Sequence, residues 1–306
     1  MSNFAPPAEL SKAFISIGKA KATNTALKLF VLGILAGVFI GFAAHVATTV
    51  GTGDWTILGL KKFFIGAVFS FGLMLVVIPG SELFTGNNLL TIALLNREIT
   101  IGQMLRNWLI VYAGNLVGSL ALAWMIASGS GLLSGPVGGT AINIAYEKIT
   151  AGGAAHTSMY FWRAVGCNWL VCLAIMMAAA SKDITGKVLG IFFPIMAFVV
   201  AGFEHSVANM YFIPAGILAK SSAAAVAASG KSAELIAGLN WASMWTNNLL
   251  VVTAGNIVGG AVLCGAVYWW AFVRGTAKNV EVPVAEPAKP VEPVAVHAVR
   301  ESAVRG

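Results

Sequence analysis

The sequence predicts an all-α, polytopic membrane protein with six transmembrane helices arranged as an inverted 3+3 repeat. Three observations lead to this prediction. Of the 306 residues, 58% are hydrophobic and only 10% are charged, whereas about a quarter of the residues in a soluble domain are charged. The apolar residues gather in six long regions separated by charged residues. Motifs of the first half also recur at corresponding places in the second half.

Each apolar region is long enough to cross a bilayer, which requires about 20 residues. The six regions are bounded on at least one side by lysine or arginine, and they cover residues 29–53, 63–96, 107 onward, 164–181, 188–219 and the stretch up to 273. The bias of Lys and Arg between the loops places both termini in the cytoplasm. The chain is therefore predicted to be a multi-pass protein of the cell (inner) membrane.

The second and fifth regions are too long for a single straight span. Each exceeds 30 residues and carries an acidic residue near its middle, Glu82 or Glu204. A helix of that length rises on the order of 45 Å, which is more than the roughly 30 Å of hydrocarbon in a bilayer. We therefore expect both spans to be broken at the acidic residue, with irregular backbone that lines a cavity or is buried in protein.

Two pairs of segments match between the halves. NWLIVYAGNLVG at 107–118 aligns without a gap with NLLVVTAGNIVG at 248–259, and GSELFTGN at 80–87 shares the frame G-x-E-x4-N with GFEHSVAN at 202–209. Three spans per unit is an odd number, so the two units face opposite sides of the membrane. In transporters with such inverted repeats, paired helix breaks mark the transport site.

These features divide the chain into three parts. Residues 1–27 are predicted to be a cytoplasmic N-terminal segment. Residues 28–275 form the six-helix transport domain, with a first repeat at about 28–130 and a second at about 157–275. Residues 276–306 are rich in Pro, Val, Ala and Glu and show no helical period, so we expect a disordered cytoplasmic tail.

The composition argues against several other classes of function. The net charge of +7 does not indicate nucleic-acid binding, because the basic residues form no dense run with interleaved aromatic residues. Cys167, Cys172 and Cys264 lie in apolar stretches without metal-ligand spacing, so we expect no metal and no cofactor. The sequence also lacks His-x-x-x-His and Gly-x-Ser-x-Gly motifs, and we expect that the protein is not an enzyme.

His205 is the first candidate site residue, because an ionisable side chain in mid-membrane is costly and is a functional hypothesis by default. Thr85, in the other break, can donate to an anion or accept from an acid, although it can also bond freed backbone. Glu82 and Glu204 would repel an anion, so we interpret them as structural acceptors for backbone N–H groups freed by the breaks. Four asparagines could support the pore in a similar way: Asn87, Asn168, Asn209 and Asn248.

Several of these motifs resemble a known family. ELFTGN at 82–87 and GFEHSVANM at 202–210 are similar to the two pore motifs of the formate/nitrite transporter family, and NWLVCLA at 168–174 matches that family as well. The resemblance extends from about Lys19 to Arg274. It implies an aquaporin-like helical bundle of six spans around one pore per protomer, with five protomers in a ring. It also implies a small monovalent weak-acid anion as substrate.

The resemblance assigns further residues to the pore. Lys148, in the predicted loop after the third span, matches a lysine near the outer vestibule, where a fixed positive charge would concentrate anions. Asn168 and Asn248 match positions near the pore. Three apolar residues match the narrow constrictions on either side of the histidine, where a bare anion meets a dehydration barrier: Phe69, Leu73 and Phe198.

The resulting hypothesis is a channel or transporter for formate in the lipid bilayer. The anion would gain a proton near His205, directly or through solvent, and cross as the neutral acid or with a coupled proton. Nitrite and hydrosulfide remain the alternatives within the family. A neutral-solute channel of the aquaporin type is the alternative from another class, although it should carry two Asn-Pro-Ala motifs and this chain has none.

Overall fold

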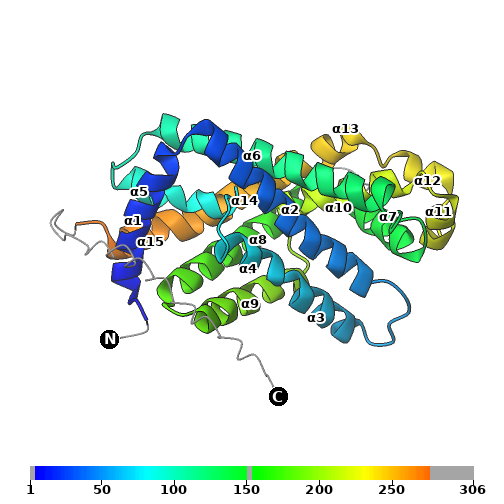
Figure 1. The fold of residues 1–306 in the computed structure, drawn as a ribbon, viewed down its shortest axis with the longest axis horizontal. Helices are drawn as coiled ribbons and strands as arrows, with labels where there is room; N and C mark the ends of the chain where they lie inside the picture. The colour runs from blue at the N-terminus through cyan, green and yellow to red at the C-terminus, as the bar shows by residue number, and fades with distance from the viewer. Residues whose placement is uncertain (1–3, 150–153, 276–306) are drawn as a thin grey trace, which may run out of the picture. The chain divides into compact units, whose positions relative to one another are not determined.

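The computed structural model describes residues 4–149 and 154–275. Within this part every regular element is a helix, and the predicted all-α membrane fold is confirmed (Figure 1). Five of the described helices are long and apolar enough to cross a membrane, or six when a bent pair is taken as one span. The predicted disordered tail lies outside the described residues.

The first unit contains an N-terminal helix that the sequence did not predict, followed by three spans. Its elements are α1 (Pro7–Thr23), α2 (Ala26–Val50), α3 (Leu58–Phe69), α4 (Phe71–Val77), the 3-10 turn η1 (Gly86–Leu89), α5 (Leu90–Leu95), α6 (Ile101–Trp124) and the π-helical turn η2 (Met125–Gly129). Thr25 separates α1 from α2, and its hydroxyl accepts from the backbone N–H of Lys28 and so caps the first span.

The second unit repeats this order. Its elements are α7 (Pro136–Ile149), α8 (Ala154–Ala180), α9 (Ile184–Val200), α10 (Ser206–Ala219), α11 (Ala223–Ser229), α12 (Ala233–Ala237), α13 (Trp241–Met244), the π-helical η3 (Trp245–Leu249), α14 (Leu250–Ile257), the π-helical η4 (Val258–Ala266) and α15 (Val267–Phe272). The last five form one long span. Each unit therefore contains a shorter helix, α1 or α7, before its three spans.

The two predicted helix breaks are confirmed. One separates α4 from η1 and contains Glu82, and the other separates α9 from α10 and contains Glu204. Gly80 and Gly202, the first residues of the two G-x-E frames, have φ of +93° and +76°. Glycine adopts this left-handed conformation at little cost, and it ends many helices in this way. The shared glycine therefore ends each half-helix just before its glutamate.

The predicted loop at Lys148 is wrong, because this residue lies in the last turn of α7. The beginning of α7, PVGGT, has a proline and two glycines that lower helix propensity. Packing requires those glycines: a Cβ at Gly138 would lie 2.0 Å from the carbonyl oxygen of Leu133, and one at Gly139 would lie 2.7 Å from the carbonyl carbon of Ala228. Tertiary contact with α11 therefore outweighs local propensity here.

Glycines also let α2 and α6 pack backbone to backbone. A Cβ at Gly37 would lie 2.1 Å from the carbonyl oxygen of Asn115, and one at Gly118 would lie 2.0 Å from that of Ile34. A Cβ at Gly259 in η4 would likewise lie 2.1 Å from the carbonyl oxygen of Val165 in α8. In lipid, small residues at such crossings allow the close packing that drives helix association.

Gly118→Ala is expected to destabilise the protein by about 1–3 kcal/mol, because the new methyl group meets backbone and forces the two helices apart. Thermal unfolding of the detergent-solubilised protein checks this. Gly59→Ala in α3 is the matched control, since nothing lies within 4 Å of a Cβ there, and alanine favours helix. A Gly118→Ala protein that melts with the wild type would contradict the packing argument.

Candidate functional site

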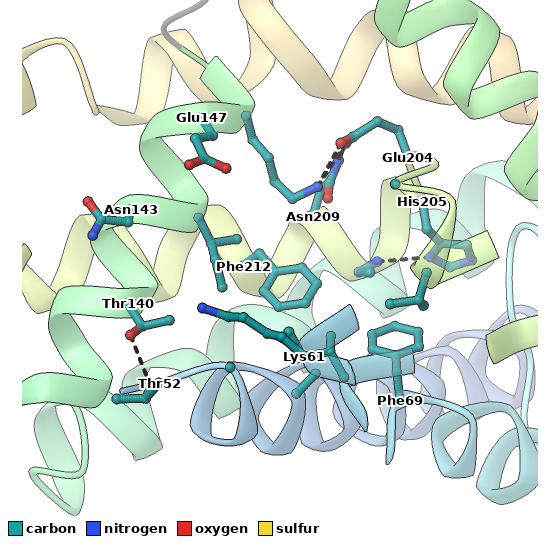
Figure 2. A pocket seen from close by; sticks show the side chains of 18 of the residues that line it. Thr52, Lys61, Phe69, Thr140, Asn143, Glu147, Glu204, His205, Asn209 and Phe212 are labelled. Carbon is teal, nitrogen blue, oxygen red and sulfur yellow. Dashed lines mark hydrogen bonds and ion pairs between the residues drawn. The ribbon is translucent and has the colours of Figure 1, made fainter. Parts of the chain in front are cut away.

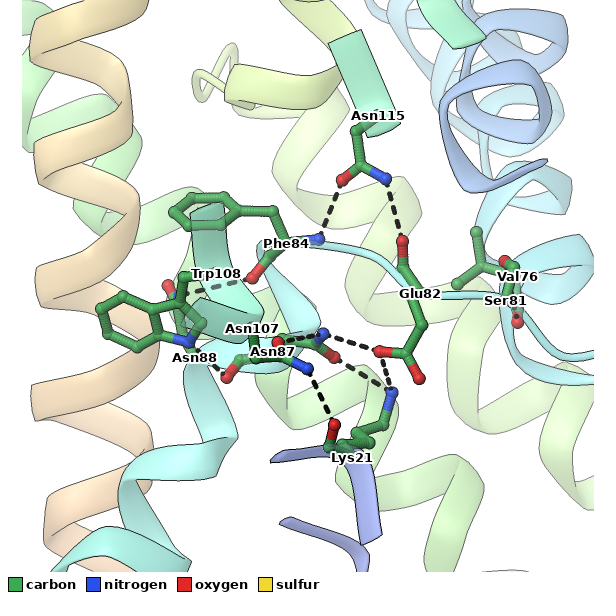
Figure 3. A network of polar contacts seen from close by, with 10 residues as sticks. All are labelled: Lys21, Val76, Ser81, Glu82, Phe84, Asn87, Asn88, Asn107, Trp108 and Asn115. Atoms are coloured by element: carbon green, nitrogen blue, oxygen red, sulfur yellow. Dashed lines mark hydrogen bonds and ion pairs between the residues drawn. The ribbon is translucent and has the colours of Figure 1, made fainter. Parts of the chain in front are cut away.

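An asparagine from the third span of each unit holds the break of the middle span. In the first unit, Asn115 Nδ2 donates to the carbonyl oxygens of Gly33 (2.8 Å) and Glu82 (2.9 Å), and its Oδ1 accepts from the N–H of Phe84 (2.9 Å). Asn115 is fully buried. One amide thus satisfies two backbone groups of the break, the Glu82 carbonyl and the Phe84 N–H (Figure 3), and joins the break to α2 through Gly33.

The second unit reproduces the same bonds. Asn256 Nδ2 donates to the carbonyl oxygens of Ala164 (2.8 Å) and Glu204 (2.9 Å), and its Oδ1 accepts from the N–H of Ser206 (2.9 Å). Asn115 and Asn256 are the paired asparagines of the Ala-Gly-Asn segments that the sequence comparison aligned. Their identical bonding explains why the AGN frame persists in both units.

The carboxylate in each break is bound by side chains. In the first break, the Glu82 carboxylate accepts from Lys21 Nζ (2.8 Å) and from Asn87 Nδ2 (2.7 Å), as Figure 3 shows. Asn87 also donates to Asn107 Oδ1 (2.9 Å), and Asn107 donates back to the carbonyl oxygen of Lys21 (3.1 Å). We expected Glu82 to accept hydrogen bonds from backbone N–H groups of the break. The Phe84 N–H instead donates to Asn115, and the Glu82 carboxylate is bound by Lys21 and Asn87, so that interpretation is corrected.

The second break carries an equivalent cluster. Lys148 Nζ donates to both carboxylate oxygens of Glu204, each at 2.9 Å. Asn209 Nδ2 donates to the same carboxylate (2.6 Å) and to Asn248 Oδ1 (2.7 Å), and Asn248 donates to the carbonyl oxygen of Lys148 (3.0 Å). Figure 2 shows Glu204 and Asn209 together in the cavity wall. Here too the glutamate accepts from side chains, those of Lys148 and Asn209.

The lysines extend the repeat beyond the spans. Lys21 lies near the end of α1 and Lys148 near the end of α7, and each binds the glutamate of its own unit. Sequence reasoning missed Lys21. The two lysines are 127 positions apart in the sequence and the two glutamates are 122 apart, so an ungapped comparison of the units does not pair the lysines.

His205 and Thr85 join the two breaks. Thr85 Oγ1 lies 2.9 Å from His205 Nε2, and both residues are buried. His205 Nδ1 accepts from the N–H of Ala208 (3.0 Å) and so caps α10. With Nδ1 as acceptor, the proton of the neutral ring resides on Nε2 and is donated to Thr85. The hydroxyl hydrogen of Thr85 is not used in that bond.

The backbone of Thr85 is fixed by α8. Asn168 Nδ2 donates to the Thr85 carbonyl oxygen (3.2 Å), to Asn88 Oδ1 (2.8 Å) and to the Asn256 carbonyl oxygen (2.7 Å). The thiol of Cys172 also lies 3.5 Å from the Thr85 carbonyl oxygen. Asn168 therefore connects the first break to the third span of the second unit.

Aromatic rings adjoin the histidine. The Phe198 ring stacks on His205 with centroids 5.9 Å apart, and Phe69 meets Phe198 edge to face at 5.7 Å. Leu73 is buried in the same hydrophobic cluster as the two phenylalanines. Phe212, which sequence reasoning did not single out, stacks on Phe69 at 6.3 Å. An apolar residue among apolar residues carries no sequence signal of its own, so Phe212 could not be found without the structure.

Two cavities approach the His205–Thr85 pair. The Lys148 cavity, of about 740 Å³, is lined by Lys148, Glu204, His205 and the ring of Phe212 among others (Figure 2). The Lys21 cavity, of about 490 Å³, is lined by Lys21, Glu82 and Gly86, the residue after Thr85. Each cavity thus contains one lysine–glutamate pair. Among the described residues, no group of three or more His, Cys, Asp or Glu side chains is placed to hold a metal ion.

Comparison with known proteins identifies similar chains. A family model described as formate/nitrite transporter matches residues 8–270. A probable formate transporter of Methanothermobacter thermautotrophicus is 42% identical over 288 residues, which cover 89% of this chain and 99% of the relative. Formate channel FocA of Escherichia coli (strain K12) is 38% identical over 277 residues, or 88% of this chain and 94% of the relative.

A solved structure with a similar fold is described as a pentameric formate channel with formate bound. It matches with a TM-score of 0.72 and 36% sequence identity, over 81% of this chain and 98% of that chain. A second solved structure, described as an FNT family ion channel, has a TM-score of 0.71 and 31% identity over 86% of this chain and 98% of that chain.

Proposed function

We propose that this chain, which belongs to the formate/nitrite transporter family, conducts formate along a path that joins the Lys148 cavity to the Lys21 cavity. The chain is a multi-pass membrane transporter of that family and not an enzyme. The 2.9 Å contact between Thr85 and His205 carries the proposal, because it joins hydrogen-bonding groups of both repeats, and His205 lines the Lys148 cavity while Gly86, next to Thr85, lines the Lys21 cavity. The formate named for the relatives supports the choice of substrate.

The centre of the proposed path is apolar and raises the barrier for a charged solute. Phe198 is buried against His205 and Phe69 is buried against Phe198, and an anion that passes the two rings must lose hydrating water. Lys148 attracts the anion to the cavity mouth, although its ammonium group is already bound to both oxygens of Glu204. Lys148 therefore attracts an anion less strongly than an unpaired lysine would. Because the neutral acid loses less hydration energy than the anion at the apolar rings, the protonated acid crosses them over a lower barrier than formate itself.

Solvent is the favoured source of the proton. A proton added to Nδ1 of His205 would face the N–H of Ala208, which Nδ1 now accepts, and α10 would lose a cap of about 0.5–2 kcal/mol. The neutral ring instead presents Nε2–H and Thr85 presents its hydroxyl. In this scheme formate passes His205 as a hydrogen-bonded partner and takes its proton from water in a cavity.

We further propose five copies of the chain in the cell membrane, with both termini and the Lys21 cavity on the cytoplasmic side. The pentameric assembly named for the similar solved structure supports the first part, and the distribution of Lys and Arg supports the second. The mass of the detergent-solubilised assembly tests the pentamer. Protease access to tags at the two termini of the protein in cells tests the orientation.

Competition in proteoliposomes tests the substrate. Labelled formate is expected to enter vesicles that hold the protein faster than empty vesicles, and unlabelled formate to compete more strongly than nitrite or hydrosulfide at equal concentration. In this scheme the His205 and Thr85 side chains donate hydrogen bonds to the planar carboxyl group of the substrate. Stronger competition by nitrite or by hydrosulfide would reassign the substrate within the family, and vesicles without any anion uptake would overturn the proposal.

A further inference from the structure

We propose that Phe212 is a positioning residue of the Lys148 cavity, whose ring holds the Lys148 ammonium group over the path and links it to the constriction at Phe69. This inference rests on the proposed function of the same site. Lys148 Nζ lies 5.6 Å from the centroid of the Phe212 ring. The ring also stacks on Phe69 with an interplanar angle of 18°. Figure 2 shows Phe212 in the cavity, beside Phe69 and Asn209.

The two units differ at this position. Phe212 lies three residues after Asn209, and the residue three after Asn87 is Leu90. Leu90 lines the Lys21 cavity as Phe212 lines the Lys148 cavity, but it has no ring to present to Lys21. The contact is therefore a property of the second unit, which also carries the histidine, and it does not follow from the duplication.

The Phe212 ring adds a second restraint on the position of the Lys148 ammonium group. The bonds from Lys148 to the two oxygens of Glu204 restrain the ammonium group, while the four-carbon stem of a lysine remains flexible. The negative face of an aromatic ring attracts a cation, with an effect on the order of twofold to tenfold in an equilibrium. Phe212 therefore favours the position in which the ammonium group stays within the cavity.

The Phe212 ring also connects the Lys148 ammonium group to the constriction formed by Phe69 and Phe198. Lys148 contacts Phe212, Phe212 stacks on Phe69, and Phe69 meets Phe198, which stacks on His205. A displaced Phe212 ring would move both the charge at the mouth and the wall of the narrow passage. We therefore expect Phe212 to affect how readily an anion enters, measured as the formate concentration that half-saturates flux, more than the maximal flux.

The test compares Phe212→Leu, which installs the residue of the first unit, with Phe212→Tyr, which keeps a ring face. Initial rates of formate uptake are measured in proteoliposomes over a range of formate concentrations. Phe212→Leu is expected to raise the half-saturating concentration by about threefold or more, with the maximal rate within about twofold of wild type. Phe212→Tyr is expected to match the wild type. Phe212→Met, which also lacks a ring, replaces the leucine variant if that variant does not fold.

The same substitution in a protein that lacks the ion pair shows whether Phe212 acts by positioning Lys148 or only by lining the cavity. In a Lys148→Met/Glu204→Gln protein the Lys148 cation is absent, so Phe212→Leu is expected to change the half-saturating concentration much less than in the wild type, with only the contact to Phe69 left to lose. An effect of the same size in that background, or an equal effect of Phe212→Leu and Phe212→Tyr, would overturn the proposal. So would a Phe212→Leu protein with wild-type concentration dependence.

The contact is also measured without substrate. A double-mutant cycle on the melting temperature, with Phe212→Leu and Lys148→Met, is expected to show non-additive effects, whereas Phe212→Tyr in place of Phe212→Leu is expected to show none. Additive effects for the leucine cycle would overturn the proposal even if formate is conducted. Wild-type vesicles without formate flux would instead overturn the proposed function, and the cycle would still decide whether the ring holds the lysine.

Discussion

Formate flux through His205→Phe proteoliposomes is expected to fall at least about tenfold below wild type. The substitution removes the Nε2–H donor that faces Thr85 and places a third ring beside Phe198 and Phe69. A hydrogen bond to a neutral group contributes about 0.5–1.5 kcal/mol, or up to roughly tenfold in rate, and the added apolar ring raises the dehydration barrier further. The measurement is the initial rate of formate uptake at two external pH values.

His205→Asn separates transport from folding. The asparagine oxygen can still accept from the N–H of Ala208 and cap α10, because asparagine is among the best N-cap residues. Its shorter side chain does not extend to Thr85 as the imidazole does. We expect this variant to melt close to the wild type and to conduct formate poorly. If both variants retain wild-type flux and the wild-type response to pH, the central role of the histidine is excluded.

Lys148→Met is expected to lower the free energy of unfolding by about 3–5 kcal/mol, the usual cost of leaving one charge of a buried pair without its partner. The Glu204 side chain is only 7% exposed and would be left without its cation. Thermal unfolding in detergent measures the loss. The double variant Lys148→Met/Glu204→Gln is expected to recover most of it, because glutamine carries no charge and can still accept from Asn209.

The first unit supplies a matched control for this experiment. Lys21 binds Glu82 through one oxygen, and its side chain is 28% exposed, compared with 16% for Lys148. Water can therefore solvate the first pair more readily, and Lys21→Met is expected to cost less stability than Lys148→Met. Equal losses in the two variants, or a double variant as unstable as Lys148→Met alone, would contradict this account of the ion pairs.

The spans and their breaks could be predicted from the sequence because lipid imposes a length on apolar runs. Glu82 and Glu204 interrupt runs that are too long, and the paired AGN segments place both interruptions in one repeat. His205 and Thr85 could be selected because a polar residue within an apolar membrane span is costly, and such residues are therefore candidates for a functional role. The structure then places them within hydrogen-bonding distance of each other.

Other parts of the site could not be predicted from the sequence. Lys21 lies in a segment that reads as an ordinary charged N-terminus, and only the fold shows that it occupies the place of Lys148 in the other unit. The partners of the glutamates were also wrong, because sequence spacing does not show that Asn115 and Asn256 already satisfy the freed backbone. The roles of the constriction residues stay predictions.

The bonds of Asn115 and Asn256 have a consequence for biogenesis. The carbonyl and N–H groups of each break receive their partners from the third span of the same unit, which the ribosome makes last. Unpaired backbone groups are not tolerated in hydrocarbon. The middle span of each unit therefore reaches its final broken form only after the span that follows it has packed against it, and the first break also waits for Asn168 of the second unit, which binds the carbonyl oxygen of Thr85.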